Sequence, residues 1–145
     1  MKDLISVRSS LFALALCSLG VAHNTNSDPR LLHVRAVFVS GNNQAAERAR
    51  ELLQEGGTCL SLATKASAAD ATMDLAEESH SQGGQFGSMG ARNSVVSATV
   101  TLASGDLVWS KSERGIDAPF KSGSKAAGAV LVKRLAKDAG CQHSH

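Results

Sequence analysis

Apolar and polar residues follow two periods along this chain, one typical of strands and one typical of helices. Ser94 to Ala103 alternates clearly, so Val96, Ala98, Val100 and Leu102 are expected on the buried face of a strand. The segment from Leu31 to Val39 ends in a nearly continuous apolar run, which predicts a strand in a buried, central position of the sheet. Five segments are predicted strands: Leu31 to Val39, Thr58 to Ala63, Ala71 to Glu77, Ser94 to Ala103 and Leu107 to Arg114.

Helical spacing of apolar residues appears in two segments, Asn43 to Glu55 and Lys125 to Ala139. Ser40-Gly41-Asn42 separates the first helix from the preceding strand and can cap it, and Ser122 or Ser124 can cap the second helix. A short helical turn is expected at 67–70. The expected buried positions of the two helices are Ala45, Ala49, Leu52, Leu53, Gly128, Leu131, Val132, Leu135 and Ala139.

The order of these elements is β-α-β-(short α)-β-β-β-α, which predicts an α+β fold. We expect a two-layer sandwich in which two main helices cover one face of a mixed sheet of about five strands. The first β-α-β unit predicts a parallel pair, and the last three strands predict an antiparallel meander around the turn Ser104-Gly105-Asp106. Leu107 and Trp109 are expected to share one face, with Trp109 as a large core residue.

The N-terminal segment is typical of a signal peptide. Lys2 and Arg8 precede an apolar run, Leu11 to Leu19, which is shorter than the roughly 20 residues that span a bilayer. Gly20 and Ala22 are small residues at the −3 and −1 positions of a cleavage site, which predicts cleavage between Ala22 and His23. We therefore expect residues 1–22 to be a signal peptide, 23–30 a flexible mature N-terminus, 31–141 a single domain and 142–145 a flexible tail, in a periplasmic or secreted protein.

The cysteines fit the same compartment. A lipid anchor at Cys17 is disfavoured because Leu16 stands where acylation requires a small residue. Cleavage would leave Cys59 and Cys141, for which a single disulfide is expected in an oxidising compartment. The alternative is a pair of unpaired, buried thiols.

Composition excludes some functions. The 145-residue chain has a net charge of +2, so it lacks the strongly basic patch expected of a nucleic-acid-binding protein. Aromatic residues make up only 3% of the chain, which argues against base stacking and aromatic-lined sugar sites. No apolar run is long enough for a membrane span.

A glycine-rich segment, 83–90, separates two predicted strands. A phosphate-binding loop would need a helix after it and usually a lysine, and this segment has neither, so a long hairpin loop is expected. Phe86 and Met89 are its candidate partner-binding residues, because they would offer apolar contact area at the end of that loop.

Histidines provide the candidate metal ligands. His143 and His145 lie at the C-terminus, and His80 could join them if the two regions met in space. The two imidazoles at the C-terminus are fewer than the roughly three or four protein ligands that a zinc site requires. We therefore predict no metal site and no cofactor.

The sequence offers no catalytic constellation. It contains neither the Gly-x-Ser-x-Gly nor the His-Glu-x-x-His motif. Ser88, His80 and Asp74 are close in sequence, but proximity on a loop does not make a triad. Glu77 and Glu78 are interpreted as a solvated strand end. The expectation is that the protein is not an enzyme.

Three segments carry a resemblance to small periplasmic α+β modules of Gram-negative envelope machines. These are the Val-rich strand from Val34 to Val39, the Ala-Asp-Ala entry to a strand at Ala69 to Leu75, and the hairpin Gly105 to Ser110. The pattern resembles the N-terminal domain of TolB, the curli-secretion lipoprotein CsgG and the penicillin-binding-protein activator LpoB. The resemblance implies a non-enzymatic envelope protein.

Together these observations predict an exported, non-catalytic binding or assembly accessory protein of the cell envelope. Its expected partner is another envelope protein, which could pair with an exposed sheet edge. One alternative is a periplasmic metal- or small-ligand-binding protein that uses the histidine-rich end and the glycine-rich loop. The third is an uncharacterised hydrolase.

Overall fold

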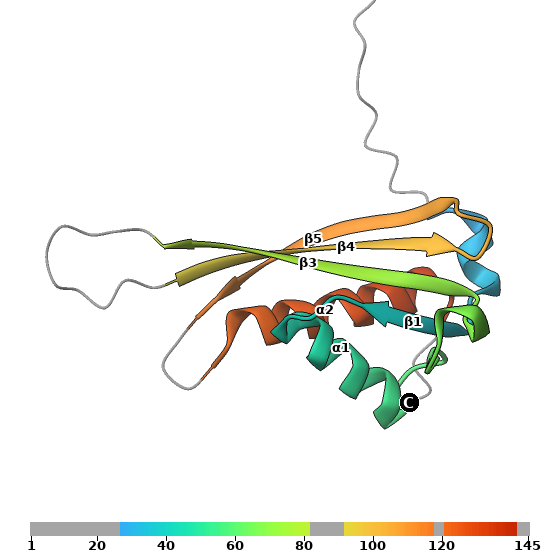
Figure 1. The fold of residues 1–145 in the computed structure, drawn as a ribbon, viewed down its shortest axis with the longest axis horizontal. Coiled ribbons are helices and arrows are strands. Elements are labelled where there is room, and N and C mark those ends of the chain that lie inside the picture. The colour runs from blue at the N-terminus through green and yellow to red at the C-terminus, as the bar shows by residue number, and fades with distance from the viewer. Residues whose placement is uncertain (1–26, 82–91, 118–120, 142–145) are drawn as a thin grey trace, which may run out of the picture.

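A single mixed sheet of five strands, in the order β2-β1-β3-β4-β5, forms one layer of the molecule. The structure is a computed structural model and describes residues 27–81, 92–117 and 121–141. Figure 1 shows both main helices on the same face of the sheet. The elements are η1 (Pro29–His33), β1 (Ala36–Ser40), α1 (Gln44–Glu55), β2 (Ser61–Leu62), η2 (Ala66–Ala68), β3 (Ala71–Ser81), β4 (Arg92–Leu102), β5 (Leu107–Ile116) and α2 (Gly123–Asp138).

The strand pairing confirms the predicted α+β class. β1 pairs in parallel with β2, as a β-α-β unit requires, and also pairs in parallel with β3. β3, β4 and β5 form the predicted antiparallel meander. The meander therefore leaves β5 at one edge of the sheet and the two-residue β2 at the other.

The prediction that residues 31–39 form one strand is wrong in its first half. Asp28 caps a 3-10 helix by accepting a hydrogen bond from the Arg30 backbone N–H, and Pro29 stands in its first turn. Leu31 and Val34 are buried, but they reach the core from η1 and from the residue that follows it. An apolar run alone does not distinguish a strand from a short helix.

Other boundaries also differ from the prediction. The second strand shrinks from 58–63 to Ser61–Leu62, whereas the third extends to Ser81. The cap of α1 is Asn43, whose side chain accepts from the Ala46 N–H, so it replaces Ser40-Gly41-Asn42 in that role. Ser122 caps α2, accepting from the Lys125 N–H.

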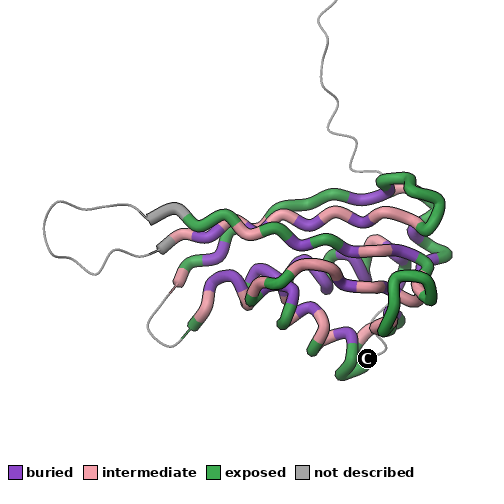
Figure 2. The backbone as a smooth tube through the Cα atoms, viewed as in Figure 1, coloured by how far each residue is buried: buried purple, intermediate pink, exposed green. Residues whose placement is uncertain are grey.

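The core lies between the helices and the inner face of the sheet. In Figure 2, buried segments alternate with more exposed ones along the strands, as expected when only one face is covered. The helices approach closely at Gly128, where a Cβ atom would lie 2.5 Å from the Ala45 carbonyl oxygen. The buried helical residues include Ala45, Ala49, Leu53, Gly128, Leu131, Val132 and Leu135 as predicted, with Ala139 just after α2; Leu52 is partly buried.

A β-bulge changes the predicted pattern at the start of β5. The register shifts between Val100 and Thr101, so Val108 is an extra residue beside Trp109. Val108 and Trp109 are both buried, while Leu107 is 59% exposed. The expectation that Leu107 and Trp109 share a buried face is therefore wrong, although Trp109 is a core residue as predicted.

Candidate functional site

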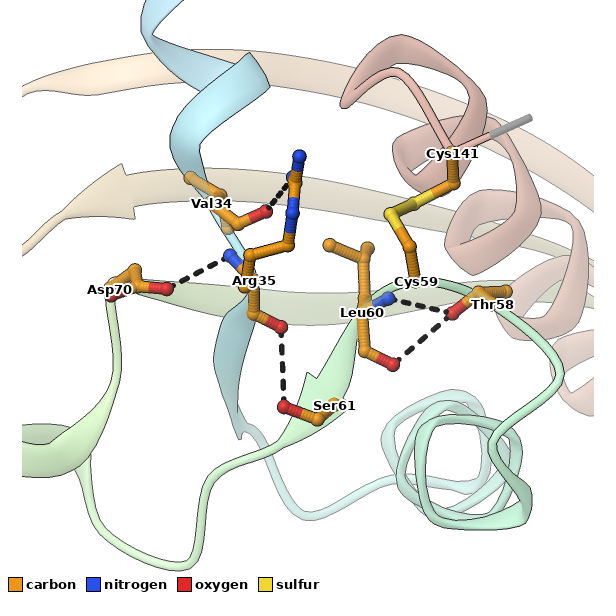
Figure 3. Close-up of a disulfide and its surroundings, with 8 residues drawn as sticks. All are labelled: Val34, Arg35, Thr58, Cys59, Leu60, Ser61, Asp70 and Cys141. Atoms are coloured by element: carbon orange, nitrogen blue, oxygen red, sulfur yellow. Dashed lines mark hydrogen bonds between the residues drawn. A yellow bond between two sulfur atoms is a disulfide. The ribbon is translucent and has the colours of Figure 1, made fainter.

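The predicted disulfide between Cys59 and Cys141 is present. Their Cα atoms are 5.3 Å apart, and the bond closes a sequence separation of 82 residues. Figure 3 shows that it joins the segment before β2 to the chain just after α2, where Gly140 has a left-handed backbone. The bond therefore ties the short edge strand to the last helix, and it fits a protein that folds in an oxidising compartment.

Several predicted site residues lie outside the described residues. These include Phe86 and Met89, the histidines His143 and His145, the proposed cleavage position at Ala22 and His23, and Cys17. His80 belongs to β3. Across residues 27–81, 92–117 and 121–141, no three His, Cys, Asp or Glu residues gather into a group that could hold a metal ion.

A buried polar cluster links α2 to the sheet. The Ser124 hydroxyl donates to the Glu77 carboxylate and lies 3.1 Å from the Ser94 hydroxyl oxygen. Ser94 and Ser124 are 1% and 3% exposed, so neither can reach a substrate in solution. Glu77 is thus half-buried and engaged, contrary to the expected solvated strand end. The cluster is a structural joint between three elements.

Asp74 also has a structural partner. It lies on the outer face of β3, opposite Ser40 in β1, and accepts a hydrogen bond of 2.5 Å from the Ser40 hydroxyl. The bond links β1 to β3 on the outer face of the sheet. Ser88, which is close to Asp74 in sequence, lies outside the described residues.

Asp70 has a structural role that the sequence did not predict. Its carboxylate accepts hydrogen bonds of 2.8 Å from the backbone N–H groups of Arg35 and Ala36, and its own N–H donates to the Ala36 carbonyl. The bonds from Ala36 and then Arg35 lower the pKa of the Asp70 carboxyl. Figure 3 shows Asp70 beside Arg35, where it joins the start of β1 to the start of β3.

The Asp70→Asn variant is expected to be less stable than the wild type at neutral pH and equally stable in acid. A depressed carboxyl pKa contributes stability above the unfolded value of about 3.9, and the contribution disappears as the pH falls through the folded value. Because the group is largely exposed, the difference at pH 7 should be about 1 kcal/mol. Urea unfolding at pH 7 and below pH 3 measures it. An equal difference at both pH values would contradict this assignment.

A hollow of about 440 Å³ lies beside Asp70, between η1 and the turn that joins β4 to β5. Its one arginine, Arg30, is already paired with Asp28 at 2.8 Å and with Asp106 at 2.9 Å. The carboxylate of Asp70 is engaged by backbone N–H groups. The charged groups of this hollow are therefore satisfied within the protein, and it does not favour the small-ligand alternative.

The long edge strand β5 presents a different kind of site. β5 pairs with β4 on one side only, and no backbone hydrogen bond joins residues 107–116 to any described residue outside the sheet. Successive residues of an antiparallel strand alternate in direction, so about half of its N–H and C=O groups point away from β4. Ser110, Lys111, Ser112 and Arg114 are exposed along it. This open edge is the candidate functional site.

The fold and the disulfide define the class as a small, disulfide-bonded α+β module whose sheet ends in a long edge strand, β5, and a two-residue edge strand, β2. None of its described helices has the length and apolar character needed to cross a membrane. No protein-family model matches the sequence, and no curated protein matches it either.

Comparison with solved structures shows likeness in fold only. A PelC dodecamer from Paraburkholderia phytofirmans is 17% identical, with a TM-score of 0.48, and the match covers 74% of this chain and 88% of that one. A minor lipoprotein from Acinetobacter baumannii is 5% identical, with a TM-score of 0.42 and coverage of 76% and 97%. These likenesses concern the fold alone, and they carry no argument about function.

Proposed function

We propose that this protein is an exported, non-catalytic binding or assembly protein of the cell envelope, and that it binds its partner by adding a strand to β5. The observation that carries the proposal is the open edge of β5, whose outward backbone groups have no partner among the described residues. An extended segment of another protein can satisfy such groups with backbone hydrogen bonds.

Two features support this reading. The disulfide fits folding outside the cytoplasm, where such bonds persist. The described polar clusters, Ser94 with Ser124 and Asp70 with β1, are engaged in holding elements together. No buried side-chain nitrogen or oxygen in the described ranges lacks a hydrogen-bond partner. The open backbone edge is therefore the feature that a partner can use.

Crosslinking in the native host's envelope provides the first test. A photo-reactive amino acid replaces Ser112 on β5, and a matched variant carries it at Gln54, which is exposed on α1. We expect one protein to be crosslinked from position 112 and not from position 54. After identification by mass spectrometry, that protein is purified and its affinity for the unmodified chain is measured.

A pair of adjacent proline variants then tests strand addition. Lys111→Pro and Ser112→Pro each remove one backbone N–H, and neighbouring N–H groups point to opposite sides of β5. One variant should therefore lose a bond to β4 and stability. The other should keep its stability and lose partner affinity by about tenfold or more. Unchanged affinity in the variant that remains stable would rule out pairing at this edge.

A further inference from the structure

The side chains around the open edge give it a distinct charge. Lys111 faces the helix side of the sheet, because it lies between Trp109 and Glu113 in the alternating pattern of β5. Glu113 binds Arg134 of α2 at 2.7 Å, and the Trp109 indole N–H donates to Asp138 of α2 at 2.8 Å. These two contacts place the C-terminal half of α2 directly beside the inner side of β5.

One side of α2 continues this surface. Val130, Arg134 and Lys137 are spaced so that they share the side of the helix that faces β5. We call the surface formed by β5 and this side of α2 the β5 flank. Its charged residues are Lys111, Glu113, Arg114, Arg134, Lys137 and Asp138.

The β5 flank is cationic. Four cations and two anions give it a net charge of 4 − 2 = +2. Both anions are already engaged, Glu113 by Arg134 and Asp138 by Trp109. Lys111 and Lys137 on the helix side, and Arg114 on the outer side of β5, have no ion pair or side-chain hydrogen bond with any described residue, so these charges are available to a partner.

We propose that the strand bound by β5 is an acidic, extended segment of a partner protein, with carboxylates on every second residue. This inference rests on the proposed function and specifies its partner. In a strand added beside β5, alternate side chains would point toward α2 and lie next to Lys111, Arg134 and Lys137. Opposite charges on directly adjacent strands stabilise the pair, whereas like charges destabilise it.

The charge pattern also disfavours a second copy of this chain at the same edge. Two β5 strands paired with one another would bring Lys111 and Arg114 of one copy near the same residues of the other. Such like-charge neighbours weaken pairing and are one of the ways in which natural edge strands avoid self-association. The cationic edge therefore favours an acidic strand over a second copy of this chain.

The side chains on the outer side of β5 indicate which residues should alternate with the carboxylates in the partner strand. Ser110 and Ser112 are exposed there, and the Ser112 hydroxyl lies 2.9 Å from that of Ser97 on β4. Threonine pairs well with such hydroxyl-bearing neighbours across strands and favours extended structure. A peptide that alternates glutamate and threonine is thus a suitable probe.

The test measures binding of such a peptide, about ten residues long to match the edge strand, to the purified protein by fluorescence anisotropy. A peptide of equal length that alternates lysine and threonine is the control. We expect only the acidic peptide to bind. Its affinity should fall several-fold between about 0.05 M and 0.5 M salt, because screening weakens exposed charge pairs.

Charge-reversal variants test whether the acidic peptide binds at the β5 flank. The double variant Lys111→Glu with Lys137→Glu is expected to weaken binding of the acidic peptide by about tenfold or more. Lys65→Glu, a reversal of an exposed lysine beside η2 near the opposite edge, should leave binding unchanged. Urea unfolding of each variant checks that it remains folded.

Two results would overturn the inference. One is equal binding of the acidic and basic peptides. The other is an equal loss of affinity from Lys65→Glu and from the double reversal, which would indicate a general charge effect. These outcomes are separate from failure of the proposed function, which the proline pair reports with the physiological partner. A partner that needs the β5 backbone but has no acidic strand would refute this inference alone.

Discussion

Replacing Cys59 and Cys141 together with serine is expected to lower the free energy of unfolding by about 4 kcal/mol. The bond closes a separation of 82 residues, and in the chain-entropy account a loop of that length strongly restricts the unfolded ensemble. The native contacts should remain, because the replacement changes only one atom in each side chain. Urea unfolding of the oxidised wild type and of the double variant measures the difference.

The reduced wild type is the control for this comparison. It should unfold at the same urea concentration as the double serine variant, since both lack the crosslink. If the double variant matched the oxidised wild type instead, the crosslink would not contribute to stability. The loss of stability should be greatest near β2, which has only two residues in the sheet and is linked through Cys59 to the end of α2.

The second large effect is expected at Trp109. Truncation of Trp109 to alanine should cost about 4 kcal/mol, because a large buried aromatic side chain would leave a cavity between β5 and α2. The matched variant Trp109→Phe keeps an aromatic ring but removes the indole N–H that binds Asp138 at 2.8 Å. It should cost less, about 1–2 kcal/mol beyond any repacking.

Thermal or urea unfolding of the two Trp109 variants separates these contributions. An alanine variant as stable as the phenylalanine variant would mean that the aromatic ring packs no better than a methyl group. Asp138→Asn provides an independent check, because its amide oxygen still accepts a hydrogen bond from Trp109. That variant should stay close to the wild type in stability.

The architecture can be predicted from the sequence because the spacing of apolar residues differs between strands and helices. Val96, Ala98 and Val100 alternate with polar residues, and all three are buried in β4. Leu131, Val132 and Leu135 repeat at helical spacing and are buried in α2. The glycine at 128 fits the same pattern, since the close approach of α2 to Ala45 leaves no room for a Cβ atom.

The errors have two sources: a local cap outweighs the apolar pattern at η1, and pairing with a neighbouring strand changes the pattern of β5. Leu31 and Val34 look like strand residues, but the Asp28 cap and Pro29 favour a 3-10 turn, which buries both by a different route. The bulge at Val108 cannot be inferred from β5 alone, because it depends on the register with Val100 in β4. Alternation along one strand does not specify the residues opposite it.

The candidate site was only partly predictable for a related reason. Phe86, Met89 and the histidines stand out in the sequence by their side chains, whereas the edge is made of backbone groups that every strand possesses. The order of the meander does signal it, because the last strand of a three-strand meander has one neighbour. The positions of Lys137 and Arg134 beside that edge become visible only once α2 is docked on β5.

Amide hydrogen exchange of β5 tests the central account most directly. The rates are measured by NMR on the full protein, with and without the alternating glutamate–threonine peptide. Slower exchange is predicted at alternate residues of β5 between Ser110 and Arg114, with little change in β2 or α1. Binding without new protection in β5, or with protection confined to another element, would contradict strand addition at this edge.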